Sequence, residues 1–113
     1  MPGIDAPDEI DVIAEDSDGS ALLSIVQTGG WSGSGSERTR LKRKLATYLR
    51  YAQDGQMVSR YPTLAGRPVV IALMYDERPP QALLEYWRRR GESLARAGVR
   101  LIARPLSDTV WRA

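Results

Sequence analysis

The side chains that could perform chemistry in this 113-residue chain are carboxylates, lysines, serines, threonines and tyrosines, because the sequence contains neither histidine nor cysteine. The missing histidine removes the usual general base near neutral pH and the commonest transition-metal ligand. The missing cysteine excludes disulfides, a thiolate nucleophile and a zinc–thiolate site. Two charged clusters remain: seven acids within residues 1–36, and six bases between residues 38 and 50.

The aspartates near residue 16 have the composition of a calcium loop but lack its spacing. If Asp16 and Asp18 stood at the third and fifth ligand positions, Ala14 would take the first and Ile25 the twelfth. Both of those positions require carboxylates. Residues 16–19 are therefore predicted to form a turn, in which aspartate bonds its own backbone and glycine accepts a positive φ. We expect no bound metal.

Residues 29–36 form a Gly/Ser-rich stretch directly before a basic segment. A glycine-rich loop that leads into a helix can hold a phosphate group on free backbone N–H groups. Neither of the two common phosphate-binding glycine patterns is present here. We therefore predict a surface loop and no cofactor. Trp31 within this loop either folds back onto the core or serves as a contact residue.

Residues 37–54 are predicted to form a helix, because Leu41, Leu45 and Tyr48 make an apolar stripe at helical spacing and Gly55 ends it. Its basic side chains are candidate contacts to nucleic acid or to a partner protein. The alternative is a solvated helix face that offsets the acidic N-terminal third. The candidate contacts are Arg38, Arg40, Lys42, Arg43, Lys44 and Arg50, together with Trp31.

Charge is divided unevenly along the chain. Residues 1–36 carry a net charge of −7 and residues 37–113 a net charge of +9, which gives +2 for the whole. The asymmetry indicates either charge complementarity within the fold or two surfaces of opposite potential. The first residues show no signal-peptide pattern, and the apolar run Val69–Tyr75 is too short to span a bilayer. We expect a cytoplasmic and, from the abundance of arginine and alanine, bacterial protein.

The remaining pattern predicts one α/β (α+β) domain over residues 1–113 with the order ββαβαβ. Alternation over residues 9–15 predicts a strand, and the short turn that follows it makes residues 21–28 its antiparallel hairpin partner. The unbroken apolar run at residues 69–75 predicts a central strand, reached through a loop of about a dozen residues. A second helix is expected from Pro79 to about Ala97, and a last strand over residues 99–104.

These elements predict a mixed four-stranded sheet with two packed helices and a right-handed final crossover. Gly91 lies on the apolar face of the second helix, where it would let the helix approach the sheet closely. Residues 1–8 are expected to be a flexible N-terminus. Residues 105–113 are expected to be a C-terminal tail, with Val110 and Trp111, that covers a sheet edge or reaches a second subunit.

The hairpin at residues 9–28 resembles the core hairpin of restriction-endonuclease-like, PD-(D/E)XK-type proteins. In that superfamily one strand supplies an aspartate and the next an acid-x-Lys triplet, which hold a divalent metal at the scissile phosphate. The resemblance places the aspartate at Asp11 and the triplet at Ile25, Val26 and Gln27. A hydrocarbon and an amide replace the acid and the lysine, so the resemblance implies a degenerate relative in which Asp11 is a relic of a nuclease site.

A second resemblance is to an uncharacterised family of small bacterial domains. It is carried by the Trp31 loop, by the helix pattern Leu-x-x-Lys-Leu-x-x-Tyr-Leu from residue 41, and by Tyr61-Pro62. No activity comes with it.

The sequence thus favours a non-catalytic protein-interaction module, such as an immunity or accessory protein, that binds another protein or a second copy of itself. The alternatives are a nucleic-acid-binding domain that uses the basic helix at residues 37–54, and a metal-dependent nuclease with an atypical site that uses Asp11 with Glu15 or another acid. We expect no enzyme, no membrane contact and no cofactor.

Overall fold

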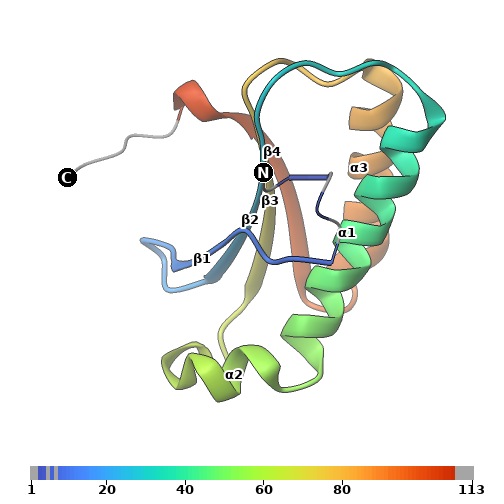
Figure 1. Cartoon of the computed structure of the whole chain (residues 1–113). Helices are drawn as coiled ribbons and strands as arrows, with labels where there is room; N and C mark the ends of the chain where they lie inside the picture. The colour runs from blue at the N-terminus through green and yellow to red at the C-terminus, as the bar shows by residue number, and fades with distance from the viewer. Residues whose placement is uncertain (1–2, 5, 7, 109–113) are drawn as a thin grey trace.

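The computed structural model describes residues 3, 4, 6 and 8–108. It has four strands, with the two long helices on one side of them and a short helix beyond one end of the sheet (Figure 1). In chain order the elements are β1 (Val12–Glu15), β2 (Ala21–Gln27), α1 (Gly35–Gln53), α2 (Gln56–Arg60), the 3-10 turn Pro62–Leu64, β3 (Val69–Tyr75), α3 (Gln81–Ala95), β4 (Val99–Pro105) and the 3-10 turn Leu106–Asp108.

The four strands form one mixed sheet in the order β1-β2-β3-β4. β1 pairs antiparallel with β2, while β2–β3 and β3–β4 are parallel. The expected mixed sheet with an N-terminal hairpin is therefore confirmed. Both parallel connections step in the same direction across the sheet, and right-handed crossovers then put both helices on the same face. Figure 1 shows α1 and α3 together on that face.

The core lies between the sheet and the two long helices. Side chains of β2 and β3 alternate between the two faces, and Leu23, Ile25, Ile71 and Leu73 face the helices, fully buried. On the other face of β3, Val70, Ala72 and Met74 are also buried, which explains why β3 reads as an unbroken apolar run. From the helices the core receives Leu41, Leu45, Tyr48, Leu83, Tyr86 and Trp87.

The close approach expected at Gly91 is present. A Cβ placed on Gly91 would lie 3.4 Å from the Cβ of Leu101 on β4. The outer edge of β4 is also partly covered by α3, because the Trp87 indole N–H donates to the carbonyl oxygen of Ile102 at 2.9 Å. Pro105 ends the same strand. Such features blunt an edge strand against pairing with another chain.

Two expected boundaries are wrong. The first strand begins at Val12, not near residue 9, because the Tyr48 hydroxyl takes the place of the next ladder contact, as described below. The long loop expected before β3 contains α2 and a 3-10 turn. Met57 and Leu64 anchor this segment, since both are buried in the core cluster. The described part of the chain therefore contains three α-helices where two were expected.

The two chain ends also differ from expectation where they are described. Within the segment expected to be flexible, Ile4 is only 1% exposed and belongs to the core, and Asp8 pairs with Arg43. At the other end, the segment expected to be a tail starts at Pro105, which is the last residue of β4, and continues as the 3-10 turn Leu106–Asp108. Val110 and Trp111 lie outside the described residues. Among the residues that the structure describes, no helix is long and apolar enough to cross a membrane.

Candidate functional site

Asp11 forms a buried ion pair with Lys44. The Lys44 Nζ lies 2.6 Å from Oδ1 of Asp11, and the two side chains are 0% and 1% exposed. The other carboxylate oxygen, Oδ2, accepts the backbone N–H groups of Gly3 at 3.0 Å and of Val26 at 2.9 Å. Both oxygens of Asp11 are therefore occupied within the chain. This is the arrangement that a buried charge requires to be tolerated.

Tyr48, one helical turn after Lys44, completes this buried cluster. Its hydroxyl accepts the backbone N–H of Asp11 at 2.8 Å and donates to the carbonyl oxygen of Ser24 at 2.7 Å. The phenol oxygen thus stands between β1 and β2 where the next ladder hydrogen bond would form, so β1 begins at Val12. Burial raises the pKa of Tyr48 well above its ordinary value, and the charge of Asp11 adds to that effect.

This geometry gives Asp11 a structural role. Ile25, where the resemblance would put an acid, is fully buried. Gln27, where it would put a lysine, accepts the backbone N–H of Ile4 at 2.9 Å. Among the described residues no group of three or more acids could hold a metal ion. Glu15, the second acid proposed for the nuclease site, pairs with Arg67: its Oε2 lies 3.7 Å from Nη2 of Arg67.

The structure does not assemble the six bases of α1 into one surface. Lys44 is buried in its ion pair. Arg43 forms a bidentate pair with Asp8, at 3.1 and 2.7 Å. Arg38 lies over the ring of Tyr86, 4.9 Å from its centroid. Of the others, Lys42 and Arg50 are exposed and Arg40 bonds back to Ser36.

The Gly/Ser loop is fixed by Glu37 in the first turn of α1. Its buried carboxylate accepts the backbone N–H groups of Ser32 and Gly33, both at 2.7 Å. These two loop amides are therefore engaged by a carboxylate of the same chain and are not free to hold a phosphate. Trp31 packs against the core and donates its indole N–H to the carbonyl oxygen of Glu77 at 2.7 Å.

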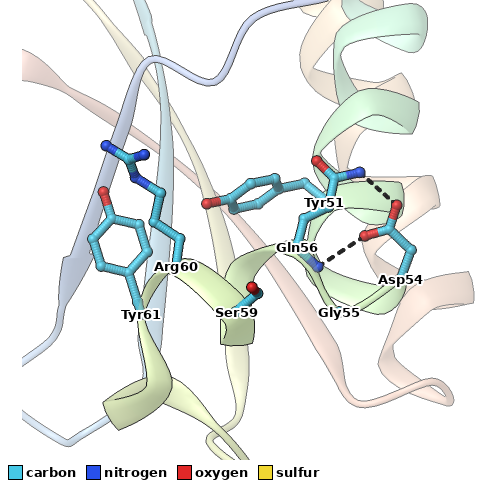
Figure 2. Close-up of a pocket in the computed structure, with 7 residues that line it drawn as sticks. All are labelled: Tyr51, Asp54, Gly55, Gln56, Ser59, Arg60 and Tyr61. Atoms are coloured by element: carbon cyan, nitrogen blue, oxygen red, sulfur yellow. Dashed lines mark hydrogen bonds between the residues drawn. The ribbon is translucent and has the colours of Figure 1, made fainter.

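A wide depression lies where α1 ends and α2 begins, and its volume is about 910 Å³. In Figure 2 the ring of Tyr51, from α1, points towards Arg60 and Tyr61, at the end of α2. Partial burial raises the pKa of Tyr51; Tyr61 adds to the shift and Arg60 opposes it. We call this surface the α1–α2 groove; its lining residues are Tyr51, Asp54, Gly55, Gln56, Ser59, Arg60 and Tyr61.

The sequence did not reveal the α1–α2 groove, because its residues come from a helix end and from a segment expected to be a loop. A signal was nonetheless present. Tyr51, Arg60 and Tyr61 flank Gly55, whose φ of +93° turns the chain sharply between the two helices. When a glycine ends a helix and aromatic and basic residues follow it closely, the chain can turn back so that these residues and the end of the helix share one surface.

The fold and the site define a small α+β domain with a mixed sheet, a buried ion pair and an open groove beside α2. The chain belongs to DUF6572, a family of unknown function whose model matches residues 2–107. Neither a search of curated proteins nor a search of solved structures found a match. Membership of an uncharacterised family is thus shown, while a restriction-endonuclease-like core is not.

Replacing Lys44 with methionine is expected to lower the free energy of unfolding by about 3–5 kcal/mol, because it leaves the Asp11 carboxylate charged and buried without its cation. Urea denaturation measures the change. Lys42→Met is the matched control, since Lys42 lies on the exposed side of the same helix and should change stability little. The double variant Asp11→Asn with Lys44→Met should lose less stability than the sum of the losses of the two single variants. A loss equal to that sum would contradict a mutual ion pair.

Tyr48 makes the stability of the protein sensitive to alkaline pH. Unfolded tyrosine ionises near pH 10, whereas burial raises the pKa of folded Tyr48 above that value. Its contribution is therefore fully present below about pH 10 and is lost as the pH rises further. Urea denaturation between pH 8 and 11 should show a steeper alkaline loss for the natural protein than for Tyr48→Phe. Identical pH profiles would contradict a buried, neutral phenol.

Proposed function

We propose that this protein is a non-catalytic protein-interaction module that binds an acidic segment of another protein in the α1–α2 groove. One observation carries the proposal: two tyrosines and an arginine from separate helices converge on one open depression (Figure 2). Tyrosine and arginine are the side chains most often found at the energetic centres of protein interfaces. Tyr61 itself, and Val58 on α2, are two of the few large apolar side chains that the described surface exposes.

The charge of the groove supports an acidic partner. A second hollow of about 290 Å³ adjoins the groove and shares Tyr51 and Gln56 with it, and Arg50 lines this hollow. Of the nearby acids, Asp8 pairs with Arg43, whereas Asp54 keeps its charge and accepts two hydrogen bonds from the neutral Gln56. Arg50 and Arg60 together exceed Asp54 by one positive charge, and they are the cations that a carboxylate from outside would meet.

The same residues argue for binding without turnover. The lining side chains are hydroxyls, an amide, a guanidinium and the carboxylate of Asp54. That carboxylate is bonded to both the backbone and the side chain of Gln56, so it is not aimed at Ser59 as a general base would be. An accessory or immunity protein in the bacterial cytoplasm, without enzymatic activity, is the role we propose for such a module.

Two other functions have less support. Nucleic-acid binding by α1 is weakened because Lys44, Arg43 and Arg38 are engaged within the chain. A descent from restriction-endonuclease-like proteins is supported by one feature, an aspartate at the start of the first hairpin. That aspartate, Asp11, would have to release Lys44 before it could bind a metal.

A photo-crosslinking amino acid tests the groove directly. Placed at Val58, which is exposed on α2, it should link the protein inside cells to one partner in a defined ratio. The charge reversal Arg60→Glu in the same chain should reduce that crosslink about tenfold or more, because it removes a cation that meets the partner's carboxylates.

The matched control places the crosslinker at Ala82, an exposed residue in the first turn of α3. Ala82 lies beside the start of α1, whereas the groove lies at the end of α1, so it should not capture the same partner. Equal crosslinks from both positions, or no effect of Arg60→Glu, would reject the groove. The purified protein can also be tested for binding of labelled DNA or RNA. Binding that weakens with salt, and that is lost in the double variant Lys42→Ala with Arg50→Ala, would favour the nucleic-acid alternative.

A further inference from the structure

The described residues of the N-terminal segment form a turn, in which the Ala6 N–H donates to the carbonyl oxygen of Gly3 at 3.1 Å, and this turn is held against the body of the protein. Three of its backbone groups bond to side chains of the body. The Gly3 N–H donates to Asp11 and the Ile4 N–H donates to Gln27, at 3.0 and 2.9 Å. The Ala6 carbonyl oxygen accepts from Lys44 at 3.0 Å. These three contacts are made to the backbone of Gly3, Ile4 and Ala6.

Two positions of the segment are selected by shape. The side chain of Ile4 is only 1% exposed and fills a site in the core. Gly3 has a φ of +102°, and a Cβ there would lie 2.3 Å from Oε1 of Gln27 and 2.9 Å from the carbonyl oxygen of Val26. The second of these neighbours is backbone and cannot turn aside. The site therefore requires a glycine followed by an aliphatic residue.

The side chains of the body that contact the segment are held in place by other parts of the fold. Asp11, Gln27 and Lys44 are placed by the start of β1, by β2 and by α1 respectively. Asp11 remains tied to Lys44 and to the Val26 N–H, so two of the three recognising side chains are fixed without residues 3–6. If the segment leaves, Oε1 of Gln27 loses its buried donor and the Ile4 site is emptied. Both changes favour refilling by a similar segment.

We propose that Asp11, Gln27 and Lys44 form a peptide-binding site that residues 3, 4 and 6 of the same chain occupy, and that it accepts from another protein a turn-forming segment with glycine followed by a branched aliphatic residue. The segment of this chain is then a built-in competitor. Because it is covalently attached, its effective concentration is on the order of millimolar. A foreign segment enters only when the N-terminus is released. The site is separate from the α1–α2 groove, and neither proposal depends on the other.

The test uses the full chain with the substitution Gly3→Val, whose side chain cannot fit against Val26 and Gln27. The probe is a fluorescent peptide with the sequence of residues 1–7, Met-Pro-Gly-Ile-Asp-Ala-Pro. We expect Gly3→Val to bind this peptide saturably and at least about tenfold more tightly than the natural chain, whose own segment fills the site. The same peptide with valine in place of its glycine, or serine in place of its isoleucine, should not bind.

Every outcome decides the proposal. A folded Gly3→Val chain that ignores the peptide, or that binds all three peptides equally, overturns it. If Gly3→Val does not fold on its own, circular dichroism is recorded with and without the peptide: recovery of the fold with the natural peptide alone supports the proposal, and no recovery overturns it. Ile4→Ser, which empties the anchor site without the backbone clash, should give the same peptide selectivity.

Discussion

A lysine and an aspartate without access to water constrain much of this structure. A buried charge is tolerated only when a partner and hydrogen bonds replace the water it has lost. Asp11 and Lys44 meet that condition jointly, and the backbone supplies the rest through Gly3, Val26 and Ala6. The pair therefore ties together three parts of the chain that are distant in sequence: the N-terminal segment, the β1–β2 edge of the sheet, and α1.

This constraint also decides which charges are available on the surface. The sequence divides into an acidic first third and a basic remainder. In the structure some of these opposite charges pair with each other within the chain. Asp11 neutralises Lys44 in the interior, and Asp8 neutralises Arg43 on the surface. The face of α1 is consequently less basic than its composition indicates. The cations that remain near α2, Arg50 and Arg60, belong to a surface that also carries tyrosines.

The elements that follow from local pattern could be predicted, and those that follow from long-range contacts could not. The two long helices have clear helical periodicity, the central strand is an unbroken apolar run, and the hairpin has a clear turn sequence; each of these elements is present. The start of β1 was missed because a tyrosine 37 residues away replaces a ladder contact. α2 was missed because five residues are too few to show a helical period. The N-terminal segment is held by hydrogen bonds to Gln27 and Lys44. These residues are distant in sequence, and no pattern in the first residues predicts the contact.

The Asp11–Lys44 pair can be tested most directly by hydrogen exchange of two backbone amides that the carboxylate of Asp11 accepts, measured by NMR on the unmodified protein. If the pair holds the N-terminal segment to the sheet, the amides of Gly3 and Val26 should both be protected, and Gly3 should exchange orders of magnitude more slowly than in a free peptide. Exchange of Gly3 at the free-peptide rate, with Val26 protected, would show that the segment is not held and would contradict this account.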